Sequence, residues 1–213
     1  TVTDTPVVIA ANYPAAMRAS KVVKVGWSTN ENSTVSSETL MMDAKSLVDA
    51  KTAGISFFAV GNLDQLDTAS MQKIEADYQT SMVAHSALEP ANALARYVDG
   101  ELHVYSGHQG GPIIPMVVSN FTGIEPEKII FHPHLVGGGF GKKFQFGVII
   151  LASLAALKTK QPVKLIFTRE DDLAFANPRS STYQRLSASV NNDKQIKGLK
   201  HEIAAGWIKG SAG

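Results

Sequence analysis

The sequence contains no cysteine among its 213 residues, and this absence excludes several kinds of chemistry. Without thiols there is no disulfide, no thiolate zinc or iron–sulfur site and no cysteine nucleophile. Net charge is nearly absent too, since 20 Lys and Arg against 19 Asp and Glu give +1, which argues against nucleic acid as a partner. No apolar run approaches the ~18 residues of a membrane-spanning helix. The longest run, residues 146–157, is interrupted by small residues.

What the sequence does have is enough apolar material for a folded core, because 44% of its residues are hydrophobic. The length fits one large domain or two small ones, and we predict a division into residues 1–75 and 76–213. The chain opens without Met and with "VVIAA" (residues 7–11), which is typical of a strand already in progress. We therefore expect a fragment of a longer protein.

Alternation and turn signals predict a mixture of strands and helices. The expected strands cover residues 7–11, 22–27, 55–61, 69–80, 127–136 and 162–168, and the expected helices begin at Pro14 and cover 37–50, 111–123 and 144–159. Two hairpins are expected to turn at Asp99-Gly100 and at residues 191–193. Because strands and helices follow no strict βαβ order, the predicted fold class is α+β, with mixed sheets and packed helices.

The stretch "HLVGGGFGKKF" (residues 134–144) is the first candidate for binding chemistry. A P-loop requires Gly where this chain has Val136, and Ser or Thr where it has Lys143. A dinucleotide fingerprint fails as well, because its last glycine falls on Lys142 or on Phe144 in the two possible frames. These mismatches disfavour a nucleotide-binding protein.

The glycine-rich loop nevertheless lies between an expected strand and an expected buried helix. The N-terminus of such a helix offers free N–H groups and the positive end of the helix dipole. Glycines also allow a ligand to approach the backbone closely. The loop therefore either binds a polar or anionic ligand or is a tight turn whose glycines relieve packing.

Other polar groups have a structural interpretation beside a functional one. His132 and His134 share one face of a strand, as half of a metal site would, but the other histidines have no matching spacing, so structural histidines are favoured. Three carboxylates in "TREDDL" (168–173) suit a helix start, which favours capping. Gln109 in "SGHQGG" (106–111) is either an amide donor or part of a turn. With no G-x-S-x-G motif, a serine triad has no support.

Five blocks follow one another along nearly the whole chain: "AANYPAAMRASKVVKVGW" (10–27), "VAHSALEPANALA" (83–95), "SGHQGG" (106–111), "EKIIFHPHLVGGGFGKK" (127–143) and "PVKLIFTREDDL" (162–173). In this order they resemble the large molybdopterin-binding subunit of the xanthine oxidase/aldehyde oxidase family. The nearest branch is the isoquinoline 1-oxidoreductase beta-subunit type, which includes bacterial membrane-associated aldehyde dehydrogenases. The resemblance implies that the chain is a fragment of a molybdenum hydroxylase large subunit.

The resemblance also implies roles for individual residues. Gln109 matches the family's glutamine whose amide donates to an oxo ligand of molybdenum, so it is a candidate for catalysis and for cofactor binding. Gly138, Gly139, Phe140 and Gly141 match the loop beside the metal and the pterin, with backbone N–H groups toward the cofactor. Phe140 also shapes the substrate pocket in this interpretation and is the second catalytic candidate. No residue of this chain is assigned as a metal ligand.

Two departures within the loop refine this expectation. Phe144 stands where xanthine-type members have a glutamate that contacts the purine, which argues for an apolar aldehyde or an N-heterocycle as the substrate. Lys142 and Lys143 stand where this branch tends to have two arginines. We expect these lysines either to help hold an anionic cofactor or to face solvent.

For function, the resemblance implies oxidation of an aldehyde or N-heterocycle with water as the oxygen source. The implied cofactor is molybdopterin cytosine dinucleotide, with iron–sulfur clusters on a small partner subunit, a cytochrome c subunit as a further partner, and a periplasmic or membrane-associated location. The general-base glutamate is expected beyond Gly213, so the fragment is expected to be inactive alone. The alternative is a non-catalytic module for binding or subunit assembly.

Overall fold

The structure is a computed structural model that describes residues 5–28, 31–50, 54–66, 68–175 and 177–206. The chain forms two compact units, each built from separate stretches. Unit 1 combines residues 1–28, 84–178 and 209–213, and unit 2 combines residues 29–83 and 179–208. The sequence-based division of this chain into residues 1–75, an N-terminal α/β portion, and 76–213, part of a first molybdopterin-binding domain, stays a prediction.

Unit 1 contains a mixed four-stranded sheet in the order β4-β3-β2-β5. Its strands are β2 (Asn92–Val98), β3 (Glu101–Ser106), β4 (Ile129–Pro133) and β5 (Val163–Ile166). β2 pairs antiparallel with β3 and β5, whereas β3 and β4 run parallel. The predicted hairpin turn at Asp99-Gly100 is confirmed, and both residues have positive φ (52° and 85°), as a tight two-residue turn requires.

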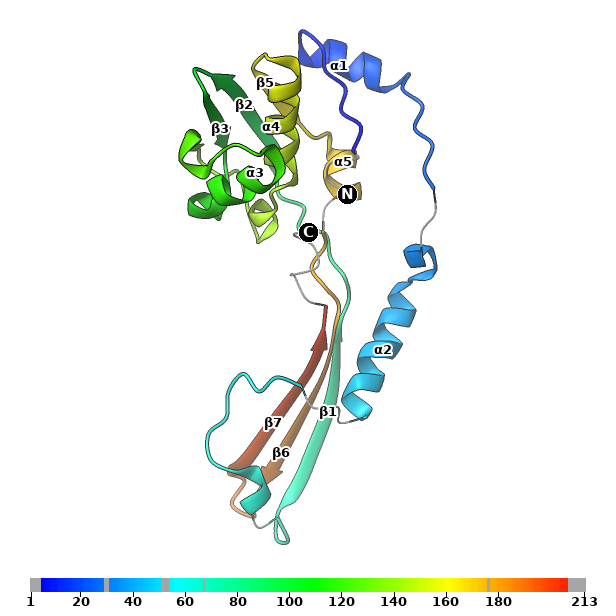
Figure 1. Ribbon diagram of the computed structural model, residues 1–213. Coiled ribbons are helices and arrows are strands. Elements are labelled where there is room, and N and C mark those ends of the chain that lie inside the picture. The colour runs from blue at the N-terminus through cyan, green and yellow to red at the C-terminus, as the bar shows by residue number, and fades with distance from the viewer. Residues whose placement is uncertain (1–4, 29–30, 51–53, 67, 176, 207–213) are drawn as a thin grey trace. The chain divides into compact units, whose positions relative to one another are not determined.

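The helices of unit 1 are α1 (Tyr13–Ser20), α3 (Ile114–Thr122), α4 (Gly147–Thr159) and α5 (Arg169–Ala174), with short 3-10 turns at Gly111–Ile113, Pro126–Lys128 and Lys142–Phe144. α3 and α4 pack on the sheet (Figure 1), and α4 is buried over most of its length. Their core includes Leu102, Val104, Ile114, Val118 and Ile149, all fully buried. This burial confirms that α4 is apolar nearly all round because it is enclosed.

Unit 2 is a three-stranded antiparallel sheet in the order β1-β6-β7, accompanied by one α-helix (Figure 1). The elements are α2 (Ser37–Asp49), β1 (Gln72–Thr80), β6 (Thr182–Val190) and β7 (Ile196–Ala205), with 3-10 turns at Glu31–Thr34 and Leu63–Gln65. Ser36 and Thr39 form a capping box at the start of α2. The second predicted hairpin is confirmed, since β6 and β7 pair across residues 191–195.

The α+β class is confirmed, but three predicted strands are wrong. Residues 7–11, 22–27 and 55–61 form no strand among the described residues. Their apolar side chains lie largely in solvent, with Val22 77% and Phe57 84% exposed. β-branched and aromatic composition favours a strand only where a partner completes the hydrogen-bond ladder, and here no described segment pairs with them. No described helix has both the length and the apolar character needed to cross a membrane.

Candidate functional site

The glycine-rich loop, residues 137–141, connects the end of β4 to the 3-10 turn at Lys142–Phe144. Gly138, Phe140 and Gly141 have φ values of 95°, 53° and 92°. Left-handed backbone is easy for glycine but costs free energy for a phenylalanine. The loop is therefore held in a specific shape by its surroundings, beyond what its glycines alone would require.

Gln109 lies directly against this loop, although 31 residues separate it from Phe140 in the sequence. The Gly141 N–H donates to Gln109 Oε1 at 3.2 Å, and the Gln109 N–H donates to the Lys143 carbonyl oxygen at 3.0 Å. A Cβ on Gly139 would lie 2.7 Å from Gln109 Cδ and Oε1. A side chain at position 139 would therefore displace the end of Gln109 from this contact. The structure brings the candidate site residues together, and their role in binding or catalysis stays a prediction.

Several donors of the site remain available to a ligand. The N–H groups of Gly137 and Gly141 bind Glu89 and Gln109. Across the described part of the chain, no hydrogen bond is made by the N–H groups of Gly138, Gly139 or Phe140. Since Oε1 of Gln109 accepts from the loop, its amide nitrogen is left as a donor as well.

Two aromatic side chains flank these donors. Phe140 is 65% exposed and Phe144 is 46% exposed. The Phe144 ring packs near His108 and Phe146, with centroid distances of 6.1 and 5.8 Å. It also approaches Gly110, where a Cβ would lie 2.7 Å from Phe144 Cε2. Phe144 is therefore anchored by the residues around Gln109 while part of its ring stays accessible.

The two lysines after the loop are buried, which shows that the expectation of solvent-facing lysines is wrong. Lys142 is 4% and Lys143 is 5% exposed. Lys142 Nζ lies 2.6 Å from Asp172 Oδ2 and donates to the Asp172 carbonyl oxygen at 2.6 Å. Lys143 Nζ lies 3.0 Å from Glu89 Oε2 and 3.2 Å from the Pro90 carbonyl oxygen. Buried ammonium groups are tolerated because each is paired and hydrogen-bonded.

The expectation that the three carboxylates of "TREDDL" serve to cap helix α5 is only partly correct. The cap itself is Thr168, whose Oγ1 accepts from the Asp171 N–H at 3.1 Å. Asp171 is exposed, but Asp172 is fully buried. Asp172 accepts from the Ala91 N–H at 2.9 Å and lies 3.3 Å from Arg169 Nη1, in addition to Lys142. Sequence reasoning missed this partner because Asp172 and Lys142 lie 30 residues apart.

Glu89 was also missed from the sequence, and it contacts the loop at two places. Its Oε2 accepts from the Gly137 N–H at 2.8 Å as well as from Lys143, and its Oε1 accepts from Asn92 Nδ2 at 2.9 Å. Burial opposes the charged form of Glu89, but the hydrogen bonds from Asn92, Gly137 and Lys143 outweigh it and hold the pKa of this carboxyl below its ordinary value. Glu89 is therefore ionised at neutral pH.

The histidine pair that could have supplied half of a metal site is divided between different surroundings. His132 Nε2 lies 3.0 Å from His103 Nδ1, and its ring stacks on Tyr105 at 4.2 Å between centroids. Burial, together with His103 and Arg96, lowers the pKa of His132. His134 is exposed. The described residues contain no group of three or more His, Cys, Asp or Glu side chains that could hold a metal ion.

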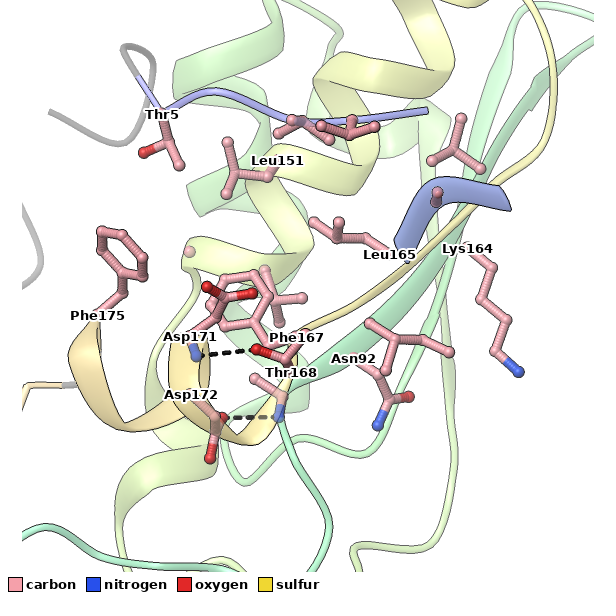
Figure 2. Close-up of a pocket in the computed structure, with 18 of the residues that line it drawn as sticks. Thr5, Asn92, Leu151, Lys164, Leu165, Phe167, Thr168, Asp171, Asp172 and Phe175 are labelled. Carbon is pink, nitrogen blue, oxygen red and sulfur yellow. Dashed lines mark hydrogen bonds between the residues drawn. The ribbon is translucent and has the colours of Figure 1, made fainter. Parts of the chain in front are cut away.

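A cavity of about 790 Å³ lies elsewhere in unit 1, between residues 5–27, α4, β5 and α5. Figure 2 shows Leu151 on α4, Leu165 on β5 and Asp172 on α5 around it. Lys142 and Lys143 also line this cavity, whereas Gln109 and residues 137–141 do not. The predicted cofactor-binding residues therefore do not line this cavity, whereas Lys142, Lys143 and Asp172 lie on its wall.

With this geometry established, comparison with known proteins gives a consistent picture. A family model described as a molybdopterin cofactor-binding domain matches residues 47–207. The chain is 34% identical over 206 residues to a membrane-bound aldehyde dehydrogenase (pyrroloquinoline-quinone) of Gluconacetobacter polyoxogenes. This match covers 96% of this chain and 26% of that protein. It is 30% identical over 155 residues to the isoquinoline 1-oxidoreductase subunit beta of Brevundimonas diminuta, covering 70% of this chain and 20% of that protein.

Among solved structures, the aldehyde oxidoreductase from Desulfovibrio gigas has a similar fold, with a TM-score of 0.59 at 21% identity. That match covers 64% of this chain and 15% of the other chain. This chain thus spans about a quarter or less of the length of the curated relatives it matches.

Proposed function

We propose a function from one premise that these comparisons establish, namely that the chain belongs to the family of molybdopterin cofactor-binding domains. In this proposal the glycine-rich loop and Gln109 form one wall of the cofactor site of a molybdenum-dependent oxidoreductase. The observation that carries the proposal is the set of unpartnered donors: the N–H groups of Gly138, Gly139 and Phe140 beside the amide nitrogen of Gln109.

The chemistry of these donors fits an anionic, oxygen-rich group. Backbone N–H groups and a side-chain amide donate to oxo and phosphate oxygens without adding a full charge. The nearby cations Lys142, Lys143 and Arg169 are paired with the carboxylates Glu89 and Asp172. The attraction for an anionic ligand therefore rests on the backbone N–H groups and the Gln109 amide. At Gly138 and Gly139 the missing Cβ allows the ligand to approach the backbone.

The bound cofactor would supply the two-electron oxidation of an aldehyde or N-heterocycle, with water as the source of oxygen. Gln109 would orient it by donating from its amide nitrogen. Phe140 and Phe144, both partly exposed, would present apolar surface to the substrate, which supports an apolar molecule over a purine. The relatives' names include both an aldehyde dehydrogenase and an isoquinoline 1-oxidoreductase.

Further features of the proposal come from the family branch alone. They are the cytosine dinucleotide form of the cofactor, iron–sulfur clusters on a small partner subunit, a cytochrome c partner, a periplasmic or membrane-associated location and a general-base glutamate outside these 213 residues.

A second candidate function, assembly with another protein surface, is favoured by unit 2. Ile74, Tyr78, Leu199 and Ile203 on its strands are each at least half exposed. A contiguous apolar surface of this kind is typical of interaction sites. This role would be compatible with the first, because a cofactor domain within a larger enzyme also makes such contacts.

The proposal is tested by analysing the natural protein, purified from its host, for bound molybdenum and pterin. We expect about one molybdopterin per chain, and at least a tenfold loss in Gly139→Ala, because the new Cβ displaces Gln109 from the loop. His134→Ala, which changes an exposed side chain outside the loop, is the matched control. Detection of pyrroloquinoline quinone in place of molybdopterin would overturn the proposal.

A further inference from the structure

We propose that Lys142 and Lys143 are positioning residues whose buried ammonium groups form two ion pairs, and that these pairs hold the glycine-rich loop against residues 87–92 and so fix the geometry in which the loop and Gln109 receive the cofactor. The name "double lock" is used below for the pairs Lys142–Asp172 and Lys143–Glu89. The reference to a cofactor rests on the proposed function, whereas the lock itself rests on contacts within the chain.

The first step concerns the backbone that joins the loop to its lysines. The Lys142 N–H donates to the Gly139 carbonyl oxygen at 2.9 Å, and the Phe144 N–H donates to the Gly141 carbonyl oxygen at 3.2 Å. These bonds close a tight turn, so the lysines cannot move without moving the loop. Their adjacent ammonium groups then bind two different carboxylates, one on α5 and one in residues 87–92.

The second step is that both carboxylates are fixed to the same segment. Glu89 belongs to it, and Asp172 accepts from the Ala91 N–H at 2.9 Å. Arg169, on the same helix as Asp172, donates to the carbonyl oxygens of Ala87 and Leu88 at 2.7 and 2.6 Å. The segment is thereby held at successive residues, and each lysine ties the loop to this common support.

The third step is that one oxygen atom joins both ends of the loop. Glu89 Oε2 accepts from the Gly137 N–H at 2.8 Å and from Lys143 Nζ at 3.0 Å. The Glu89 N–H also donates to the Gly137 carbonyl oxygen at 3.0 Å. Residues 138–141, which carry the unpartnered N–H groups, therefore span two points fixed by a single side chain.

Two other roles for the lysines fit these contacts less well. Direct binding of a phosphate would compete with two acceptors within 3.2 Å of each ammonium group. A role in stability alone does not explain the choice of charged residues, because well-packed apolar side chains generally stabilise a buried site as well as an ion pair does. A paired charge instead specifies one arrangement, which is what a preorganised donor set needs.

The test uses Lys143→Met in the natural full-length protein, with Lys128→Met as the control. Lys128 pairs with Glu125 in the same unit, and their side chains are 56% and 69% exposed. Hydrogen exchange is measured for residues 137–141 and for residues 149–156 of α4, together with bound molybdenum and pterin. We expect at least tenfold faster exchange in the loop, unchanged exchange in α4, and a several-fold loss of cofactor. Lys143→Arg, which keeps the charge, should restore most of it.

A second variant guards against misfolding caused by an unpaired Glu89. Lys143→Met combined with Glu89→Gln leaves no uncompensated charge and keeps an oxygen for the Gly137 N–H, so it should fold and still show the loosened loop. Equal acceleration in α4, unchanged exchange in the loop, or a loosened loop with full cofactor content would each overturn the inference. A wild-type protein without molybdopterin would instead overturn the proposed function, so the two failures are distinct.

Discussion

The ion pairs of the glycine-rich loop in unit 1 and those of the sheet in unit 2 use the same chemistry in opposite surroundings. Lys142 and Asp172 have side chains only 5% and 0% exposed. In unit 2, Arg185 donates to Asp77 through Nε at 2.7 Å and through Nη2 at 2.8 Å, and the Asp77 side chain is 36% exposed. The first pair is enclosed by protein, whereas the second remains in contact with water.

This difference changes what each pair can do. Water screens an exposed pair, so it contributes little and tolerates substitution. Substituting one partner of a buried pair is strongly destabilising, because the other partner's charge is left without solvent or a counterion. A buried pair can therefore fix the position of a loop. An exposed pair mainly contributes polar groups to the surface.

Unit 2 shows a second contrast, between the two faces of its sheet. Lys73, Glu75 and Asp77 of β1 lie opposite Ser189, Ser187 and Arg185 of β6, on the face where Arg185 also reaches Asp49 of α2 at 3.0 Å. Because side chains alternate along a strand, Ile74 and Tyr78 lie on the other face. The helix thus accompanies the charged face, and the apolar face has no cover among the described residues.

The largest predicted effect is on the buried pair. Lys142→Met should lower the free energy of unfolding by up to about 3–5 kcal/mol, because Asp172 stays buried and keeps only Arg169 as a counterion. Lys73→Met, which breaks an exposed pair with Glu75 in unit 2, should change it little. Urea denaturation of both variants measures the difference. Equal losses would remove the distinction between enclosed and exposed pairs.

A second prediction compares isoleucines of the two units. Ile149→Ala should destabilise the protein by about 2–5 kcal/mol, because Ile149 lies in a closely packed core and the substitution leaves a cavity. Ile203→Ala should cost less than about 1 kcal/mol, since that side chain already contacts solvent. Ile149 is 0% and Ile203 is 56% exposed. If thermal denaturation of the natural protein shows a large loss for Ile203→Ala, its sheet face is covered by something outside the described residues.

The same comparison shows what could be predicted from the sequence. Turns and caps depend on neighbouring residues only. The turn at Asp99-Gly100, the helix end at Gly123 and the start of α2 could therefore be predicted from the sequence. The double lock could not be predicted, because the pairs Lys142–Asp172 and Lys143–Glu89 join residues that lie 30 and 54 positions apart in the sequence. Composition alone also gave wrong strand predictions at residues 7–11, 22–27 and 55–61. Strand formation there depends on a partner strand as well as on the segment itself.

The smallest predicted effect is the acid sensitivity of unit 2. Hydrogen bonds from Arg185, and then from Tyr183, hold the pKa of Asp77 well below its ordinary value. A carboxyl with a depressed folded-state pKa adds stability above its unfolded value of about 3.9, and this contribution is lost as the pH falls further. Asp77→Asn should therefore lower the melting temperature slightly at pH 7, where the exposed pair contributes little, and approach the wild type below about pH 4, so that the acid decline becomes flatter. Asp64→Asn, in the exposed 3-10 turn of the same unit, is the control. An unchanged acid slope in Asp77→Asn would mean that the Arg185–Asp77 pair has no thermodynamic weight, and that unit 2 depends instead on its other contacts, among them the packing of the buried side chains Val48, Tyr183 and Val190.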